Sequence, residues 1–534
     1  MARSAHAMRA KAAGNGWREK DIGKMTDDAS RNLFALLEAR PIRPESPFIR
    51  MPEGGTLTYG DLFALTGRYA NALAARGVRL GDRVAVQVEK SPEAIVTYLA
   101  CLRLGAVFLP LNTAYTAAEM EYFIGDARPA MVVCASSKRR EIGEIAQASG
   151  TAAVETLDPA GQGTLPALAA GAPPEFRTVE RRGDDLAAIL YTSGTTGRSK
   201  GAMLTHDNLV SNAVALVDTW RFTDRDVLLH ALPIFHTHGL FVATNVVLFS
   251  GASMLFLPKF DPSLVKAALP QVTTMMGVPT FYTRLLQEDW LGRASTAHMR
   301  LFVSGSAPLL AETHREWTAR TGHAILERYG MTETNMITSN PYDGDRVPGS
   351  VGLPLPGVSV RIVDPETGRP LPRGEIGMIE VKGPNVFKGY WQMPEKTKAE
   401  FRDDGYFVTG DLGSVDERGY VSIVGRGKDL IITGGYNVYP KEVENEIDAL
   451  PGVAESAVIG VPHPDFGEGV TAVVVAKAGG APSEEEVIAR LKARLAGYKV
   501  PKRVFFVDAL PRNTMGKVLK NELRDRYAGI YAAG

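Results

Sequence analysis

The feature that most constrains the fold is a strand–helix–strand pattern between residues 83 and 111. Arg83–Val88 and Ala106–Leu111 are apolar runs of strand length. Between them, Ser91 and Pro92 form a helix start and Gly105 forms a helix stop. A helix that joins two neighbouring strands in this way requires a right-handed crossover and a parallel sheet. The pattern therefore predicts an α/β fold in which helices cover the faces of the sheets.

A second, smaller domain is expected at the C-terminal end of the chain. After Gly425 the sequence changes to a compact α+β pattern, with strands predicted at Ala457–Val461 and Val470–Ala476. Ser483–Leu495 is predicted to be a helix that begins with a Ser483/Glu486 capping box. We expect a large N-terminal domain of covered sheets and helices over residues 25–427 and a small mobile α+β domain over residues 428–534. Residues 1–24 lack an apolar core and are expected to form a disordered tail.

Composition narrows the class of function. The 534 residues carry 60 Lys and Arg against 60 Asp and Glu, so bulk charge gives no reason to expect nucleic acid or an anionic membrane as partner. Cys101 and Cys134 are too few for a disulfide framework, and we expect both to be buried in a cytoplasmic protein. Leu240–Pro258 carries no charge, but Asn245 breaks it, so a short buried helix and a strand are expected there. Asp158–Pro174 is expected to be a surface loop.

The strongest chemical signal is a Gly/Ser/Thr-rich segment directly after the apolar strand Leu186–Tyr191. Glycines let backbone N–H groups approach an anion, hydroxyls donate further hydrogen bonds, and lysine adds positive charge. The segment is not a Walker A loop, because Ser199 stands where that motif requires glycine. We expect a phosphate cradle formed by Thr192, Ser193, Gly194, Thr195, Thr196, Gly197, Arg198, Ser199 and Lys200.

Five sequence blocks in a fixed order carry a family resemblance. They are Thr192–Gly201, Tyr329–Thr334, Tyr406–Asp411, Gly425–Asp429 and Pro511–Lys517. Through these blocks the chain resembles the adenylate-forming enzymes, which include acyl-CoA synthetases, firefly luciferase and the adenylation domains of peptide synthetases. The resemblance implies an active site between a large N-terminal domain and a mobile C-terminal domain. It also implies ATP, Mg²⁺ and coenzyme A, with a carboxylate first converted to an acyl-adenylate and a thiol then displacing AMP.

The resemblance also implies roles for residues around the nucleotide. Thr332 would donate its hydroxyl to the α-phosphate, and Glu333 would bind Mg²⁺, a hard ion that prefers carboxylate and phosphate oxygens. Asp411 would accept hydrogen bonds from the ribose hydroxyls, and Arg426 would contact the ribose and phosphates. The adenine would be lined by Ser306, Ala307, Pro308 and Tyr329, and Glu327 would also belong to the nucleotide site.

Three further roles follow from the same resemblance. Lys517 would enter the site only during adenylation, where its point charge neutralises the carboxylate and the α-phosphate as they approach each other. Lys428 would be the hinge about which the small domain turns. Gly434, Gly435 and Tyr436 would then line the channel for the pantetheine arm of coenzyme A. A lysine on a mobile loop is also open to acetylation, so we expect an acetyltransferase and a deacetylase as partners acting on Lys517.

The acid substrate is predicted from charged residues at pocket-lining positions. Arg284 and Arg328 resemble the arginines of malonyl-CoA synthetases, and a guanidinium group suits a bidentate contact with the second carboxylate of a diacid. Ser304 and Ser306 would add hydroxyl donors, and His236 would form the pocket wall. We therefore expect malonate as the small-molecule substrate. Methylmalonate is also expected to be accepted, because one added methyl group changes binding by only about 1–3 kcal/mol.

Three alternatives stay open on the sequence. Each arginine could instead form a structural ion pair, for example with Glu327. The enzyme could activate a monocarboxylic acid, either short- or medium-chain or aromatic, in which case neither arginine reaches the pocket. It could also be a stand-alone adenylation module that loads a carrier protein.

Overall fold

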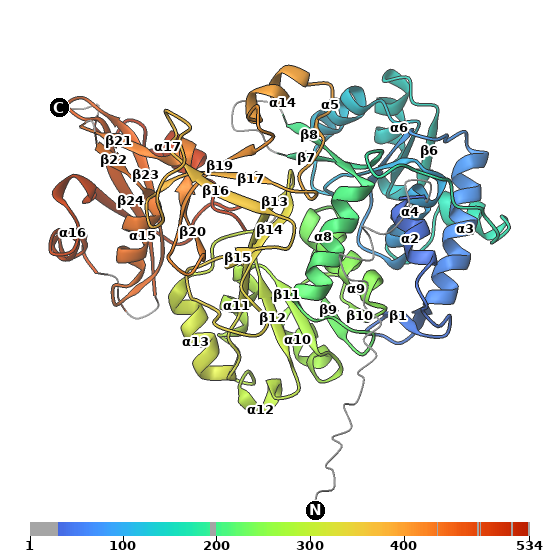
Figure 1. The fold of residues 1–534 in the computed structure, drawn as a ribbon, viewed down its shortest axis with the longest axis horizontal. Coiled ribbons are helices and arrows are strands. Elements are labelled where there is room, and N and C mark those ends of the chain that lie inside the picture. The colour runs from blue at the N-terminus through green and yellow to red at the C-terminus, as the bar shows by residue number, and fades with distance from the viewer. Residues whose placement is uncertain are drawn as a thin grey trace, which may run out of the picture.

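The structure, a computed structural model, describes residues 30–192, 199–434, 436–477, 480, 482–513 and 516–531. Three sheets with their helices form a large body, and a fourth sheet forms a smaller body at the C-terminal end of the chain (Figure 1). This is the predicted fold class, a large N-terminal domain followed by a small α+β domain. The expected tail, residues 1–24, lies outside the described residues.

The sheet predicted from residues 83–111 has seven strands in the order β18-β8-β7-β4-β3-β5-β6. Its strands are β3 (Arg83–Gln87), β4 (Val107–Pro110), β5 (Met131–Cys134), β6 (Ala153–Thr156), β7 (Leu186–Thr192), β8 (Lys200–Thr205) and β18 (Gly389–Tyr390). β3 pairs in parallel with β4 and β5, and the helix between β3 and β4 is α4 (Pro92–Leu104), capped by Ser91 and ended by Gly105 at φ 77°. The predicted strand–helix–strand unit is confirmed.

Helices cover both faces of this sheet, as predicted. Side chains alternate along β3, so that Val84 and Val86 join one hydrophobic cluster and Ala85 joins the other. Helices pack on both clusters (Figure 1). α5 (Ala117–Ala127) and α6 (Arg139–Ala148) pack on the second, and the helices on the first include α2 (Leu33–Glu38), α3 (Tyr59–Ala75), α4 and α8 (His206–Thr219). Cys101 and Cys134, one in each cluster, are free and buried.

A nine-stranded sheet lies beside the first in the large body, in the order β15-β14-β13-β12-β11-β9-β10-β1-β2. Its strands are β1 (Pro47–Arg50), β2 (Thr56–Thr58), β9 (Val227–His230), β10 (Ser253–Phe256), β11 (Thr274–Gly277), β12 (Leu301–Ser304), β13 (Leu326–Met331), β14 (Asn335–Ser339) and β15 (Leu353–Pro354). The helices around it are the π-helical turn η2 (His238–Thr244), α9 (Asn245–Ser250), α10 (Pro262–Ala268), α11 (Pro279–Leu285), α12 (Arg293–Thr296) and α13 (Ala311–Thr321). Leu240–Pro258 forms the predicted buried helix and strand.

The third sheet connects the large body to the small one. It contains β16 (Ser359–Val363), β17 (Gly377–Lys382), β19 (Phe407–Val415) and β20 (Val421–Arg426), and α14 (Pro394–Glu400) precedes β19. β20 leads into the 3₁₀ turn η4 (Gly427–Asp429), and the small-body sheet begins directly afterwards at β21.

The small body is an α+β unit built on one five-stranded sheet. Its elements are β21 (Ile431–Thr433), β22 (Tyr436–Val438), α15 (Pro440–Asp448), β23 (Val453–His463), β24 (Gly467–Ala476), α16 (Glu484–Lys492), the 3₁₀ turn η5 (Gly497–Lys499), β25 (Arg503–Val507) and α17 (Lys520–Tyr527). The two predicted strands fall within β23 and β24. The predicted Ser483/Glu486 capping box starts α16, which ends at Lys492 rather than Leu495.

One sequence expectation about the fold is wrong. Asp158–Pro174 is not a loop throughout, because Thr164–Ala170 forms the helix α7. Leu165 and Ala169 lie one turn apart on its surface and are both buried in the core beside α3. Packing of this short apolar face outweighs the Gly- and Pro-rich composition on which the loop was predicted.

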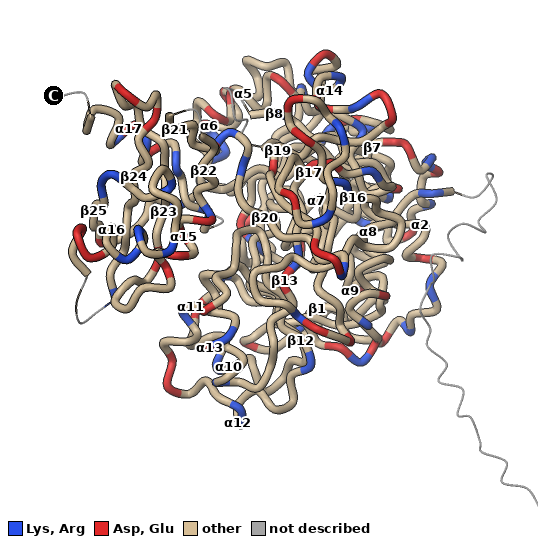
Figure 2. Tube along the Cα trace, turned by 60° about the vertical axis from the view of Figure 1, so that its left-hand side comes forward, with Lys and Arg blue, Asp and Glu red and all other residues tan. Residues whose placement is uncertain are grey.

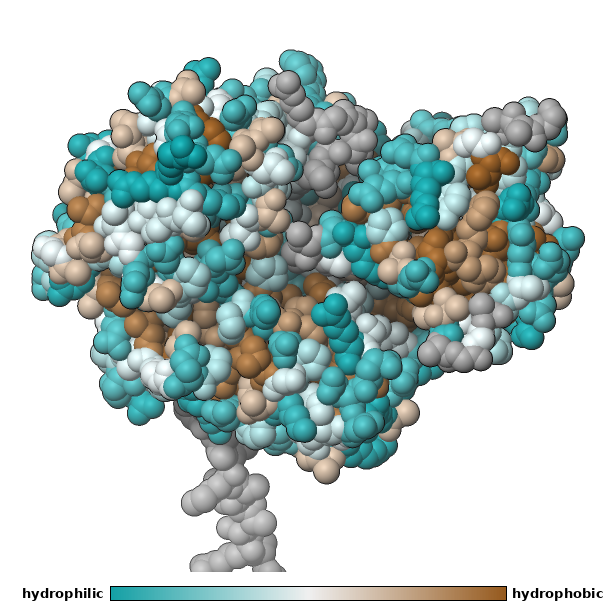
Figure 3. Space-filling view, turned by 180° about the vertical axis from the view of Figure 1, so that it is seen from behind, coloured by the Kyte–Doolittle hydropathy of each residue, from teal (hydrophilic) through white to brown (hydrophobic). Residues whose placement is uncertain are grey.

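The helices, the charge distribution and the surface of the protein bear on the partners that it can have. No helix in the described part of the chain has the length and apolar character that a bilayer crossing requires. Basic and acidic residues are interspersed along the chain (Figure 2). The space-filling view shows a hollow between the two bodies, and hydrophobic side chains gather on the exposed face of the smaller one (Figure 3).

Candidate active site

Several of the predicted site residues lie at the carboxyl ends of neighbouring parallel strands. β9, β11, β12 and β13 run side by side in the nine-stranded sheet. In open α/β sheets, ligands bind in the crevice beyond such strand ends. The segment after β9 carries His236, the segment after β12 carries Ser306–Pro308, and β13 itself carries Arg328 and Tyr329. The topology therefore brings these three distant parts of the sequence to one edge.

Arg328 is a buried arginine to which the described residues supply no carboxylate partner. Only 3% of its surface is exposed, and its Nε and Nη2 atoms have no hydrogen-bond partner. The guanidinium lies against Gly305, where an added Cβ would come within 2.4 Å of it. Burial lowers the pKa of Arg328 to about 9. Because a buried cation is costly unless it is paired, this site calls for an anionic ligand.

The neighbouring Glu327 does not pair with Arg328. Adjacent residues of a strand point to opposite faces of the sheet. One carboxylate oxygen of Glu327 accepts a hydrogen bond from the backbone N–H of Leu309 at 3.1 Å, and the other has no partner among the described residues. Burial raises the pKa of Glu327 to about 8. The structural ion pair that the sequence left open as an alternative is therefore not formed.

A second histidine, not singled out from the sequence, lies beside Arg328. His238 is buried, its Nδ1 lies 3.2 Å from the Ser306 hydroxyl, and its Nε2 has no partner in the described structure. His236 Nδ1 accepts a hydrogen bond from the backbone N–H of His238 at 3.4 Å. Burial and the nearby Arg328 lower the pKa of both histidines, that of His236 to about 4, so both are neutral at pH 7. The His-x-His spacing was the signal that could have identified His238.

We call Arg328, His236, His238, Ser304 and Ser306 the anion pocket. Ser304 is fully buried, and its hydroxyl has no hydrogen-bond partner among the described residues. Buried polar groups are normally hydrogen-bonded, so several unpartnered donors in one place indicate a site completed by a ligand. An ionised carboxylate, which accepts about four hydrogen bonds, has the chemistry to satisfy such a group of donors.

Arg284, the second predicted arginine, has a different environment. It lies on α11 with its side chain exposed, and the described residues give it no hydrogen-bond or ion-pair partner. Thr280, one turn earlier on the same face of α11, borders the lysine loop, since a Cβ at Gly516 would lie 3.3 Å from its hydroxyl. Arg284 therefore faces the space between the two bodies, and the structure does not bring it together with Arg328.

Asp411 joins Tyr329 and Arg426 at the edge of the third sheet. The Tyr329 hydroxyl donates to Asp411 Oδ2 at 2.5 Å, and Arg426 Nε lies 2.8 Å from Oδ1. Asp411 and Arg426 are direct cross-strand partners of β19 and β20. Burial and the nearby carboxylate raise the pKa of Tyr329, and the same carboxylate raises the pKa of Arg426. The carboxylate is therefore held in a fixed orientation.

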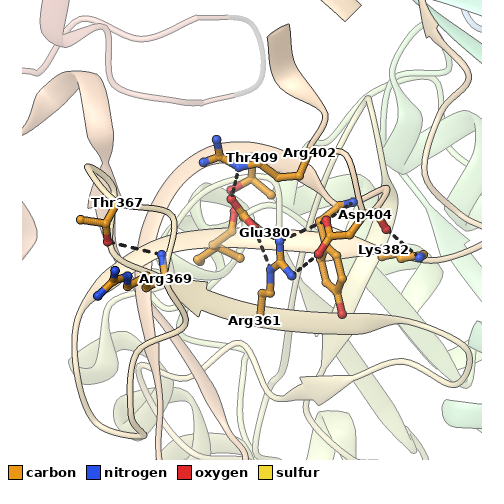
Figure 4. A network of polar contacts seen from close by, with 10 residues as sticks. Arg361, Thr367, Arg369, Glu380, Lys382, Arg402, Asp404 and Thr409 are labelled. Carbon is orange, nitrogen blue, oxygen red and sulfur yellow. Dashed lines mark hydrogen bonds and ion pairs between the residues drawn. The ribbon is translucent and has the colours of Figure 1, made fainter. Parts of the chain in front are cut away.

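A polar network braces the sheet that carries Asp411 (Figure 4). Glu380 of β17 is fully buried and pairs with Arg361 Nη2 at 2.7 Å and with Arg402 Nε at 2.6 Å. Arg361 also pairs with Asp404 at 2.5 Å and lies 3.9 Å from the centre of the Tyr406 ring. The network ties β16 and β17 to the loop from which β19 starts.

Thr409 continues this connection to the functional carboxylate. Its hydroxyl donates to the backbone carbonyl of Ile379 at 2.8 Å and accepts a hydrogen bond from the backbone N–H of Asp411 at 3.0 Å. The position of Asp411 is thus set from β17 by one hydroxyl group.

Lys517, in the C-terminal block, reaches the same region from the small body. Its side chain keeps access to solvent, yet it lies close enough to Arg426 and Asp411 for their charges to act on it. Partial burial, the largest cause, and the charge of Arg426 lower the pKa of Lys517 to about 8. Lys428, the predicted hinge, lies exposed in η4, and partial burial lowers its pKa.

The predicted phosphate cradle begins and ends on paired strands, since Thr192 of β7 pairs with Lys200 of β8. Ser193, Gly194, Thr195, Thr196, Gly197 and Arg198 lie outside the described residues. Tyr122 donates a hydrogen bond to the Ser199 backbone carbonyl at 2.6 Å, and Lys200 Nζ pairs with Glu400 at 3.1 Å.

Glu333, the predicted magnesium ligand, lies in the turn between β13 and β14 beside Thr332, which is half-buried. One of its oxygens lies 3.4 Å from the Thr192 hydroxyl and 3.1 Å from the Tyr390 hydroxyl, and burial raises its pKa. The Tyr390 hydroxyl also donates to Glu400 at 2.6 Å. Sequence analysis did not identify Tyr390 or Glu400. The residues around them in the sequence give no sign of a contact with Glu333, which lies far away in the chain.

The remaining predicted residues come from both bodies. Ser306 has a left-handed backbone at φ 73°, Ala307 is half-buried and Pro308 is exposed, all directly after β12. Gly434 has φ 57° at the turn between β21 and β22, and Tyr436 is 59% exposed and stacks on Tyr498 at 4.7 Å. Gly435 lies outside the described residues. Over the described part of the chain, no three His, Cys, Asp or Glu side chains come together as a metal site.

Comparison with known proteins adds independent information about this arrangement. Residues 38–391 match the family model described as AMP-binding enzyme, and residues 442–517 match the AMP-binding enzyme C-terminal domain. The crystal structure of ATP-bound MatB from Rhodopseudomonas palustris is 66% identical in sequence, with a TM-score of 0.93. The match covers 94% of this chain and 100% of that chain.

Two curated relatives match over most of their length. Feruloyl-CoA synthase of Amycolatopsis sp is 41% identical over 89% of this chain and 95% of the relative. The mitochondrial malonate–CoA ligase of Mus musculus is 37% identical over 88% of this chain and 89% of the relative.

Proposed function

This chain belongs to the AMP-binding enzyme family, and on that premise we propose that it joins malonate to coenzyme A, with ATP as the activating co-substrate. The enzyme is an AMP-forming acid–thiol ligase. One carboxylate of malonate attacks the α-phosphate of ATP and releases pyrophosphate, and the thiol of coenzyme A then displaces AMP from the malonyl-adenylate. Malonate–CoA ligases of mouse and Arabidopsis thaliana are each 37% identical to this chain.

The observation that carries the choice of malonate is the buried, unpaired Arg328. In the proposed complex, the carboxylate that does not react lies in the anion pocket and accepts hydrogen bonds from Arg328, Ser304 and the neighbouring donors. A monocarboxylic acid would leave this charge buried and unpaired. Sites built to hydrogen-bond one substrate group reject analogues without it by about 10⁴-fold, so acetate should be a poor substrate.

Arg284 has a second role in this proposal. Its exposed side chain borders the interdomain space, on the same face of α11 as Thr280. We assign it to the entry side of the substrate carboxylate, where a screened positive charge attracts a dianion without the desolvation that Arg328 undergoes.

The nucleotide residues keep the roles expected from the sequence. Thr192–Lys200 would hold the β- and γ-phosphates, Thr332 the α-phosphate and Asp411 the ribose, with Arg426 beside the ribose and phosphates. The adenine would lie among Ser306, Ala307, Pro308 and Tyr329, and Glu327 would also belong to the nucleotide site.

Glu333 suits a magnesium ion shared with phosphate oxygens. Magnesium in nucleotide sites is held by one or two carboxylates together with phosphates and water, so a single buried carboxylate beside the Thr192 hydroxyl fits this ion. The ion, when bound, would offset negative charge on the phosphates.

Lys517 supplies the positive charge for adenylation, and the small domain then rotates about Lys428 for the thiol step. After this rotation Gly434, Gly435 and Tyr436 would line the pantetheine channel. We place the domain boundary between residues 427 and 428, where the third sheet has ended and the small-body sheet has yet to begin. Residues 1–24 would be a disordered tail.

Two wider aspects of the proposal concern the cell. The buried, free cysteines fit a reducing cytoplasm. Acetylation of Lys517 would remove the charge that adenylation needs, so an acetyltransferase and a deacetylase would switch the enzyme off and on. The lowered pKa of Lys517, about 8, supports this proposal because the neutral amine is the nucleophile in acetyl transfer.

Acid-dependent AMP formation tests the function. The full-length enzyme is assayed with ATP, Mg²⁺ and coenzyme A against malonate, methylmalonate, succinate, acetate, butyrate and ferulate. Malonate is expected to be the best acid, with methylmalonate close to it and acetate strongly disfavoured. Turnover of ferulate or butyrate with none of malonate would overturn the choice of acid.

A further inference from the structure

Lys517 lies where two described segments of the small body, residues 511–513 and 516–519, pair as the arms of a hairpin. The backbone N–H of Leu519 donates to the carbonyl of Pro511 at 2.8 Å. Asn513 holds Lys517 from two sides, since its side-chain Oδ1 accepts from the Lys517 N–H and its own N–H donates to the Lys517 carbonyl, both at 2.9 Å. These bonds fix the shape of the hairpin but do not fix where it lies relative to the rest of the small body.

Arg512 makes polar contacts that connect this hairpin to the sheet beneath it, and Val518 packs against the hydrophobic cluster on the same sheet. Arg512 Nη1 donates to the carbonyl oxygen of Gly516, the residue before Lys517, at 2.6 Å. Arg512 Nη2 forms an ion pair with Glu455. Glu455 lies on β23, where it is the cross-strand partner of Val475 on β24. The guanidinium therefore bridges β23, which is paired along its length with β24, and the peptide bond that leads into Lys517.

We propose that Arg512 and Glu455 position Lys517 for adenylation. The inference rests on the proposed function, because it gives Lys517 its charge-neutralising role in that step. Lysine carries its charge at the end of a flexible stem, so the accuracy of its placement depends on the backbone from which the stem starts. Gly516 has a left-handed backbone at φ 76°, and glycine holds such a conformation without restricting its neighbours. The Arg512–Glu455 pair supplies the restriction that the glycine lacks.

The bridge also acts in one half-reaction only. In the arrangement described here, the hairpin borders Thr280 of the large body, and Lys517 lies near Arg426 and Asp411. When the small domain has rotated for thiol transfer, Lys517 is away from the reacting atoms, so its exact placement has no influence. Loss of the bridge should therefore slow adenylation and spare thioester formation.

The test compares both half-reactions in full-length Arg512→Gln, Glu455→Ala and the double variant. Adenylation is measured by pyrophosphate release with the acid that the wild type activates fastest, and thiol transfer by thioester formation from the synthetic adenylate of that acid with coenzyme A. We expect kcat for adenylation to fall about 10- to 100-fold in each variant, the effect of a small misplacement of a catalytic group. The KM for ATP and the rate of thiol transfer should stay within about twofold of wild type, because the groups that bind ATP and the thiol are untouched.

Two comparisons separate positioning from simple stability. The double variant should be no slower than Arg512→Gln alone, because both changes break one bridge. Arg494→Gln removes another ion pair of the small body, with Glu446, and should leave both half-reactions unchanged. Melting temperatures close to wild type would show that the fold is intact. Equal losses in both half-reactions, or no loss in adenylation, would overturn the proposal. A wild type that activates no acid at all would instead refute the proposed function.

Discussion

Arg328 is buried and has no counter-charge among the described residues. This unpaired burial lowers the stability of the protein but favours the binding of an anionic substrate. Without substrate the unpaired guanidinium destabilises the fold, because unsatisfied buried donors each cost about 1–3 kcal/mol. With substrate the same donors select a carboxylate. Stability and specificity should therefore change in opposite directions when this residue is replaced.

Arg328→Met tests this opposition. We expect the unliganded variant to be more stable than wild type by about 1–3 kcal/mol, because an apolar chain of similar volume replaces a desolvated charge. The kcat/KM for malonate should fall about 10²- to 10³-fold, as when one partner of a buried charge pair is removed. Urea unfolding and steady-state kinetics measure the two effects. A less stable variant would mean that Arg328 has an anionic partner within the protein.

The charge of Lys517 should set the upper pH limit of the adenylation activity. The group is charged below its pKa of about 8 and neutral above it, and only the charged form assists adenylation. The kcat/KM for ATP, which reports groups of the free enzyme, should therefore decline as the pH rises through about 8. Lys517→Arg should move this decline in kcat/KM to higher pH, because arginine stays charged. This shift is expected whatever the effect of the substitution on the absolute rate. A limb unchanged in the arginine variant would assign it to another group.

At the scale of elements, the third sheet links the proposed nucleotide site to the proposed hinge. β19 carries Asp411, β20 carries Arg426, and β20 leads directly into η4 with Lys428. Glu380 and its two arginines tie β16 and β17 to the loop that precedes β19 (Figure 4). The network should therefore affect ATP binding without touching ATP.

Glu380→Gln tests this connection. The amide cannot neutralise Arg361 and Arg402, and breaking a buried ion pair is destabilising, here by about 2 kcal/mol because both arginines keep access to solvent. We expect the KM for ATP to rise several-fold while the preference for malonate over acetate stays unchanged. Thermal unfolding and kinetics with both acids measure this. A changed acid preference would contradict a role confined to the nucleotide side.

The sequence predicts elements that depend on neighbouring residues, and it does not predict elements that depend on contacts between distant parts of the chain. The unit around Ser91 and Gly105 was predictable because capping residues and apolar runs act locally, and five ordered blocks sufficed for the fold class. The helix α7 was not predictable, because its two buried residues gain their stability from α3, far away in the sequence. The site follows the same division. Arg328 could be named from its block, but its lack of a partner depends on the folded surroundings.

At the scale of the whole molecule, the chain is two bodies joined through Gly427–Asp429, with the candidate site between them (Figures 1 and 3). Residues of both bodies meet there, since Lys517 of the small body lies near Asp411 and Arg426 of the large one. This arrangement suits adenylation. In the proposed thiol step, Gly434 and Tyr436 would replace Lys517 through a rotation of the small body.

Lys428→Pro should separate the two steps. Proline fixes φ at about −65° and so blocks rotation of the backbone at the proposed hinge. We expect adenylation to stay within about threefold of wild type and thioester formation from supplied adenylate to fall at least about tenfold. Rapid-quench measurements of each half-reaction test this. Unimpaired thiol transfer would place the hinge at another residue.

The uneven distribution of cysteine and tryptophan along the chain makes the proposed rotation of the small body measurable. Both cysteines are buried in the large body, and the five tryptophans of the chain all precede Gln392. The small body thus contains no native thiol and no indole fluorophore. A cysteine introduced at an exposed position such as Tyr498 would be the one thiol open to a dye in the folded protein. Energy transfer from the native tryptophans to that dye would then report the rotation of the small body in real time during turnover.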